Sequence, residues 1–174
     1  MELSSRHPQT FPEPNWKGAD FYPKDSPSRC LVDNCMKATN WDALRHYASA
    51  LNDDIKCTIL PRITNGLYHL VCLLEFENKT RWVVRIQMHK STQRLAKRLQ
   101  NEIDAMALIR ERTKVPIPRV FGYEIDGNNP TGVAFMLMEF LPGDVAIDAD
   151  GGYDIGPFPD LGGPFETATA FFDA

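Results

Sequence analysis

An arginine and a glutamate occupy segments whose other residues are mostly apolar. Arg85 lies in the stretch 81–87, RWVVRIQ, where side chains alternate with the period of two that is typical of a β-strand. Glu102 lies in the stretch 91–112, where apolar residues recur every three or four positions, as on one face of a helix. A carboxylate on such a face is costly to bury unless a cation meets it, so we expect Arg85 to pair with Glu102. A guanidinium held in this way can bind phosphate oxygens through its fork of N–H donors.

Both residues also have simpler explanations. A glutamate in a helical stripe often lies at the boundary of the buried face, and an arginine on a strand often lies on a solvated face. The order of the surrounding elements is what favours the paired interpretation.

Five strands and one long helix are expected around this pair. Short polar turns separate the first three strands, which favours antiparallel neighbours because parallel strands need long crossovers. The helix has Ser91 or Thr92 as its N-cap and ends before Pro116 and Pro118, which cannot continue it. The expected strands cover residues 56–62, 68–76, 81–87, 120–125 and 133–140.

These elements predict an α+β fold, a five-stranded antiparallel sheet with one long helix inserted after the third strand. A short helix with Asn40 as its N-cap precedes the sheet. We expect three regions along the chain. Residues 1–38 are proline-rich and polar and should form an irregular or disordered arm, 39–143 a folded domain, and 144–174 a loop and a short helix.

Composition limits the classes of function. The chain has 174 residues, enough for one domain, with 43% hydrophobic and 24% charged residues, as in soluble globular proteins. Its net charge of −4 gives no general attraction to nucleic acid or to an anionic membrane. The polar N-terminus does not resemble a signal peptide, and no apolar stretch is long enough to span a bilayer. We therefore expect a cytoplasmic protein that binds neither membranes nor nucleic acid.

Metal binding and nucleic-acid binding find little support in the residues themselves. The four cysteines and four histidines follow no zinc or disulfide spacing, so no metal site is predicted. A basic cluster at the start of the long helix lacks interleaved aromatic residues and is interpreted as a solvated helix face. This cluster consists of Lys90, Arg94, Lys97 and Arg98.

The order of elements and three local sequences together resemble the smaller lobe of the aminoglycoside phosphotransferase and choline kinase family, which shares the protein-kinase fold. The three sequences are WVVRIQ (82–87), NEIDAMALIRERTKVPIPRV (101–120) and FMLMEFLPG (135–143), and they look most similar to fungal members. The resemblance runs from about residue 55 to 143, so the domain 39–143 would be a kinase-like N-lobe. Residues 144–174 would be a remnant of the larger lobe.

The resemblance implies roles at the phosphate end of a nucleotide site. Arg85 stands where kinases generally have a phosphate-binding lysine, and Glu102 where they have its partner on the helix. Gly66 is the candidate for the turn over the phosphates, although a plain hairpin turn is the better-supported explanation of a lone glycine.

At the adenine end, the resemblance implies four further residues. Val83 shares a strand face with Arg85 and would line the adenine pocket, and Met138 would guard it. Glu139 and Leu141 would supply the backbone carbonyl and amide that hydrogen-bond adenine. ATP is accordingly the implied cofactor, with weak binding expected because half of the cleft is missing.

The catalytic carboxylates of the family are not found in these residues. No histidine has an aspartate two positions later, and no Asp-Phe-Gly triplet occurs. We therefore expect no catalytic residues, no magnesium bound by this chain alone and an incomplete enzyme. Phe165, Phe171 and Phe172 would form the apolar side of a short helix that lacks a larger lobe to cover it, which predicts a protein partner.

Two interpretations remain open at this point. The chain is either the nucleotide-binding lobe of a small-molecule kinase, which transfers phosphoryl groups to a hydroxyl in full-length relatives, or a non-catalytic kinase-like binding module. A truncated gene product would have the same sequence features.

Overall fold

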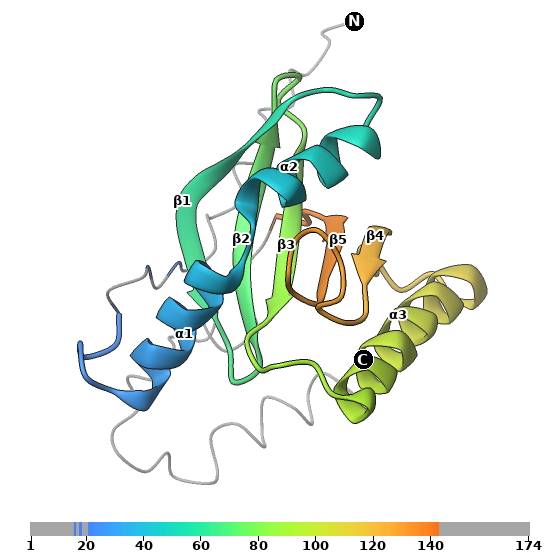
Figure 1. Cartoon of the computed structure of the whole chain (residues 1–174). Helices are drawn as coiled ribbons and strands as arrows, with labels where there is room; N and C mark the ends of the chain where they lie inside the picture. Colours follow the sequence, from blue (N-terminus) through green and yellow to red (C-terminus); the bar gives the residue numbers. More distant parts are fainter. Residues whose placement is uncertain (1–15, 17, 19–20, 143–174) are drawn as a thin grey trace, which may run out of the picture. The chain divides into compact units, whose positions relative to one another are not determined.

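The computed structural model describes residues 16, 18 and 21–142, which contain three helices and one five-stranded sheet (Figure 1). The predicted α+β class is confirmed, and the expected strand limits differ from the observed ones by three residues at most. In chain order the elements are α1 (Pro27–Ala38), α2 (Trp41–Ala50), β1 (Cys57–Asn65), β2 (His69–Phe76), β3 (Arg81–Gln87), α3 (Gln93–Arg112), β4 (Val120–Glu124) and β5 (Phe135–Glu139).

The sheet has the strand order β1-β2-β3-β5-β4, and every neighbouring pair is antiparallel. β3 is the central strand, with β2 on one side and β5 on the other. Its register places Arg85 between Val71 of β2 and Met136 of β5. Because α3 connects β3 to β4, which lies at the edge beyond β5, the long helix is inserted after the third strand as predicted.

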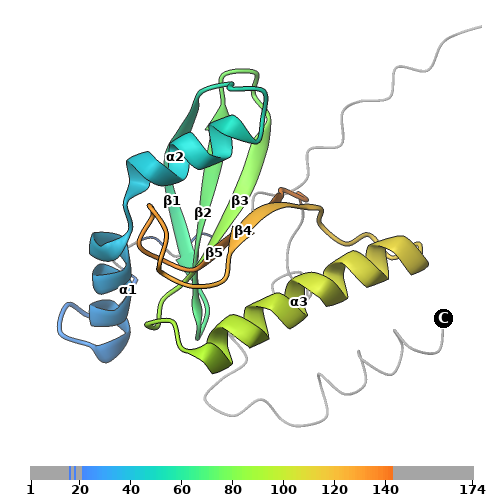
Figure 2. The ribbon, with the colours of Figure 1, turned by 45° about the vertical axis from the view of Figure 1, so that its right-hand side comes forward.

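The two faces of the sheet are covered by different helices (Figure 2). On one face, alternate residues of β3 and β5 such as Val84 and Leu137 pack into a core with residues of α1 and α2. On the other face, Met136 packs with Leu99 and Ile103 of α3. Strand alternation therefore assigns Val83 and Arg85 to the α3 face, since they flank Val84.

Helix α1 corrects the expectation that residues 1–38 form an irregular arm. The side chain of Ser26 accepts a hydrogen bond of 3.2 Å from the backbone N–H of Arg29, and Pro27 occupies the first turn. A proline is tolerated there because its missing N–H would have no partner within the helix. Val32 and Cys35 are buried against the sheet, so α1 belongs to the core. Residues 1–15, 17, 19 and 20 of the predicted arm lie outside the described residues.

Helix α3 begins where the sequence predicted. The hydroxyl of Thr92 accepts a hydrogen bond of 3.3 Å from the backbone N–H of Leu95. The helix ends at Arg112, with Thr113 as its C-cap, before the prolines. Leu99 and Ile103 are buried, whereas Ile109 is 37% exposed. The predicted apolar stripe therefore packs on the sheet mainly through the first half of the helix.

Strand β4 approaches the side chains of α2 and its C-cap residue closely at Gly122. A Cβ atom on Gly122 would lie 2.5 Å from the Cδ1 of Leu51 and 2.9 Å from the Cε1 of Tyr47. The Tyr47 ring packs edge-on against Phe135 at 5.2 Å, and its hydroxyl donates to the Tyr123 carbonyl. The ring therefore has little freedom to move away from a larger residue.

Several expectations fall on residues 143–174, outside the part of the chain that the structure describes. They include the loop and short helix after residue 143 and the partner surface at Phe165, Phe171 and Phe172. Among the described residues, no helix is long and apolar enough to cross a bilayer.

Candidate functional site

The predicted ion pair between Arg85 and Glu102 forms on the face of the sheet covered by α3. The Nη1 of Arg85 donates to the Oε1 of Glu102. The two side chains are 27% and 31% exposed, so the pair is partly shielded from water yet reachable from solvent. The guanidinium therefore keeps a fixed position with part of its donor fork open to a ligand.

His69, at the start of β2, is the second partner of Arg85. The Nη2 of Arg85 lies 3.2 Å from the Nδ1 of His69. Because a guanidinium can only donate, the Nδ1 must accept and the imidazole proton is assigned to the Nε2. Burial, and after it the charge of Arg85, lower the pKa of His69 to about 4 against the opposing effect of Glu102. The imidazole is therefore neutral at neutral pH and adds a polar but uncharged wall to the site.

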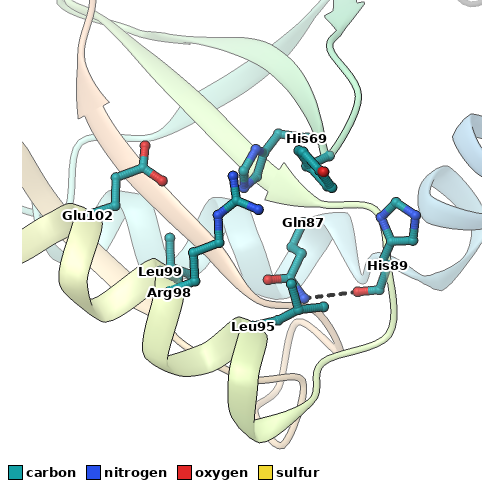
Figure 3. A pocket seen from close by; sticks show the side chains of 8 residues that line it. His69, Gln87, His89, Leu95, Arg98, Leu99 and Glu102 are labelled. Atoms are coloured by element: carbon teal, nitrogen blue, oxygen red, sulfur yellow. Dashed lines mark hydrogen bonds between the residues drawn. The ribbon is translucent and has the colours of Figure 1, made fainter.

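A small cavity lies beside this pair, between the ends of β2 and β3 and the first half of α3 (Figure 3). Its walls include His69, Gln87, Arg98 and Glu102. The volume is about 10 Å³, which is the space that one water molecule requires. A phosphate group is larger than this, so it enters only if a side chain at the rim moves.

Arg98 is a site residue that sequence reasoning missed. It was grouped with the solvated basic cluster, but its guanidinium lies over the ring of Tyr68, 4.6 Å from the ring centroid. Figure 3 shows the side chain directed from α3 toward His69. A signal was present in the sequence, because Arg98 is four residues before Glu102 and must share its helix face.

The residues implied for adenine lie farther along the same face. Val83 of β3 is directly opposite Met138 of β5 in the register, so the two predicted lining residues are cross-strand neighbours. Val83 is buried, and Met138 is partly buried against the cluster formed with α3. Two residues of a strand span about 7 Å, which separates the Cα atoms of Val83 and Arg85.

Glu139 and Leu141 lie where β5 ends. The backbone N–H of Glu139 donates to the Arg119 carbonyl at 2.8 Å, and its carboxylate accepts from the Arg119 N–H at 3.0 Å. The Nη1 of Arg110, near the end of α3, is 3.7 Å from the same carboxylate. These contacts fix the end of β5 to the segment after α3, a positioning role that the sequence did not reveal. Leu141 follows and is 42% exposed.

Gly66 lies in the turn that joins β1 to β2. Its backbone N–H donates to the His69 carbonyl at 3.1 Å, and the side-chain amide of Asn65 donates to the Gly66 carbonyl at 3.0 Å. No atom lies within 4 Å of a Cβ built at Gly66. The turn in this form therefore does not require a glycine, so only a ligand that approaches the backbone would make one necessary.

Among the described residues, no group of three or more histidines, cysteines, aspartates or glutamates is arranged to hold a metal ion. Cys35, Cys57 and Cys72 are buried free thiols and Cys30 is an exposed one. Burial raises the pKa of Cys35 to about 11 and that of Cys72 to about 12, so both are packed as neutral core residues.

Comparison with known proteins agrees with this geometry. Residues 59–155, more than half of the chain, match the Phosphotransferase enzyme family. The chain is also similar to "Altered inheritance of mitochondria protein 9, mitochondrial" of Saccharomyces cerevisiae, from strains YJM789 and RM11-1a, with 23% identity over 97 residues in each case. That region is 55% of this chain and 16% of the yeast protein, so the chain spans about one sixth of the length of these relatives. No solved structure matches. On the strength of the family match, the chain belongs to the phosphotransferase enzyme family.

Proposed function

We propose that this chain is the nucleotide-binding lobe of a small-molecule kinase and that Arg85 binds the phosphates of ATP. The observation that carries the proposal is the ion pair between Arg85 on the central strand and Glu102 on the long helix. Kinase-like phosphotransferases use a strand cation paired with a helix carboxylate at this place in the fold to hold nucleotide phosphates. Family membership supports the general class of reaction.

The charges around the cavity support an anionic ligand. Arg98, which is positive, and Glu102, which is negative, line the cavity together with the neutral His69. Arg85 does not line it but contacts both Glu102 and His69, and so adds a second positive charge to the site. The described side chains of the site therefore carry an excess of positive charge. Glu102 and His69 take up two of the five N–H donors of Arg85, so the others can serve phosphate oxygens.

The adenine would lie on the apolar patch of Val83 and Met138, with the backbone of Glu139 and Leu141 as its polar partners. Support comes from the placement of these four residues near the end of β5, on or next to the strand face that also carries Arg85. The contacts from Glu139 to Arg119 and Arg110 would hold this edge in a fixed position for the base.

We also propose that the chain by itself binds the nucleotide weakly and does not transfer its phosphate. Phosphoryl transfer requires carboxylates that hold magnesium and orient the attacking hydroxyl. The sequence contains no His-x-Asp motif and no Asp-Phe-Gly triplet. Its Asp-Ile-Gly (154–156) and Asp-Leu-Gly (160–162) triplets have the same outer residues, but no His-x-Asp motif precedes them. Magnesium ligands and the acceptor pocket would then come from a larger lobe.

The test is the affinity for ATP measured by isothermal titration calorimetry in the wild type and in Arg85→Ala. Arg81→Ala is the matched control, because Arg81 is on the same strand and forms an ion pair of its own, with Glu75 of β2 at 2.9 Å. We expect Arg85→Ala to weaken binding by about tenfold or more, and Arg81→Ala to change it by less than about twofold. Circular dichroism of both variants checks that they are folded. Equal affinity in all three folded proteins would contradict a phosphate role for Arg85.

The cytoplasmic location stays a proposal. The name of the yeast relatives places those proteins in mitochondria. Subcellular fractionation of the tagged chain would distinguish a mitochondrial from a cytoplasmic location.

A further inference from the structure

We propose that Arg98 is a second phosphate-binding residue, which Tyr68 holds in position until a nucleotide displaces it. The proposal rests on the proposed nucleotide site and adds to it a residue that selects for the length of the phosphate chain. Arg85 would meet the phosphates nearest the base, and Arg98 those farther along the chain. The ligand class is therefore a nucleoside di- or triphosphate rather than a monophosphate.

The position of Arg98 is the first support. It precedes Glu102 by one helical turn, so both side chains leave α3 toward the sheet. Arg98, Glu102 and His69 line the same small cavity, and Figure 3 shows the Arg98 side chain directed toward His69. Arg98 is also farther than Glu102 from Val83 and Met138, where adenine is proposed, because those residues lie beyond Arg85 along the strands.

The charge of Arg98 is the second support. Within the described residues, no carboxylate forms an ion pair with Arg98, while Glu102 is engaged by Arg85. An arginine that lines a cavity normally has an anionic partner or a bound anion. The lowered pKa of His69 agrees with this, since both Arg85 and Arg98 disfavour its imidazolium.

The ring of Tyr68 is the third support, because it holds the guanidinium near the cavity without neutralising it. Tyr68 ends the turn between β1 and β2, and its carbonyl accepts a hydrogen bond of 3.0 Å from the backbone N–H of Met88. The guanidinium of Arg98 lies 4.6 Å from the ring centroid. Contacts of this kind at exposed sites are weak, so a phosphate can compete with the ring for the arginine.

The size of the cavity determines what must move. At about 10 Å³ it holds one water molecule, so a phosphate enters only if a side chain of its wall moves, and we take Arg98 to be that side chain. Arg98 is exposed and Leu99 beside it is buried, so the arginine side chain can swing while the helix stays packed. Binding of a polyphosphate would therefore exchange the Arg98–Tyr68 contact for ion pairs from Arg98 to phosphate oxygens.

The test compares Arg98→Gln with Lys97→Gln by calorimetric titration with ATP, ADP and AMP. Both substitutions remove one positive charge from adjacent exposed positions of α3, so only a specific role distinguishes them. We expect Arg98→Gln to weaken ATP binding by about tenfold and AMP binding by less than about twofold. Lys97→Gln should change neither by more than about twofold, since a solvated charge is screened. Equal thermal melting of the two variants checks the fold.

A second readout follows the arginine itself. The side-chain Nε–H signal of Arg98 and the ring protons of Tyr68 should shift together in NMR spectra when ATP is added and should stay unchanged with AMP. If ATP binds in an Arg85-dependent way but Arg98→Gln has no effect, this inference is wrong and the nucleotide site stands. If the wild type does not bind ATP at all, the proposed function fails and the inference fails with it.

Discussion

Replacing Glu102 with glutamine removes the negative charge from the site and keeps the size of the side chain. Two guanidiniums, those of Arg85 and Arg98, then face the neutral His69 without a counter-charge among the described residues of the site. Fully exposed ion pairs contribute about 0.2–1 kcal/mol, and loss of one partner from a fully buried pair costs about 3–5 kcal/mol. At 27% and 31% exposure the pair lies between these limits, so we expect Glu102→Gln to lower the free energy of unfolding by about 1–2 kcal/mol.

Urea denaturation followed by far-ultraviolet circular dichroism measures this change. Glu111→Gln is the control, because Glu111 is on the same helix in an ion pair whose side chains are both 71% exposed. Its effect should stay within about 0.5 kcal/mol of zero. In the double variant with Arg85→Met, part of the loss should be recovered, since the partly buried and now unpaired guanidinium is also gone. Additive losses from the two substitutions, or a Glu102→Gln variant as stable as the wild type, would refute the coupling between the two residues.

Three further predictions concern single positions. Burial holds the pKa of His69 at about 4 in the folded state, below its value of about 6.5 in the unfolded chain. As the pH falls, the imidazole of the unfolded chain therefore binds a proton before that of the folded protein does. Stability should therefore be lost between about pH 6.5 and 4, by about 1–2 kcal/mol after allowance for partial exposure, and His69→Gln should lack this loss in urea titrations at each pH. Gly122→Ala should lower the free energy of unfolding by about 1–3 kcal/mol through its clash with α2, whereas Gly66→Ala, with open space around it, should be close to neutral; equal effects would contradict the packing at β4. In native protein, an aryl disulfide should label Cys30 rapidly and Cys72 only after unfolding, and simultaneous labelling would contradict the burial of Cys72.

The sheet and the long helix could be predicted because their signals are local. Strand alternation around Arg85 and the apolar spacing around Glu102 each fix which way a side chain points once the element forms. The cap at Thr92 fixes where the helix begins, and so which residues face the sheet. These local rules were sufficient to anticipate the ion pair, although a loop over residues 88–92 separates the strand from the helix.

Other features depended on contacts between elements that no local pattern records. Helix α1 was missed because the prolines around it suggested an arm, whereas Pro27 is a compatible first residue of a helix. His69 joins the site only through the register of β2 against β3, which places it opposite Gln87. Arg98 differs from the other residues of the basic cluster because its guanidinium contacts the Tyr68 ring. This contact depends on how α3 packs next to the turn between β1 and β2, which no local pattern in the sequence records.

The most direct test of a nucleotide site at the Arg85–Glu102 pair is an NMR titration of the isotope-labelled chain with ATP, followed in proton–nitrogen correlation spectra. We expect the signals of the side-chain Nε–H of Arg85 and of the backbone amides of Val83 and Leu141 to shift in a saturable way. The amide signals of α2, on the opposite face of the sheet, should not shift. Saturable shifts confined to the α2 face, or an unperturbed Arg85 signal in the presence of bound ATP, would contradict a nucleotide site built around the Arg85–Glu102 pair.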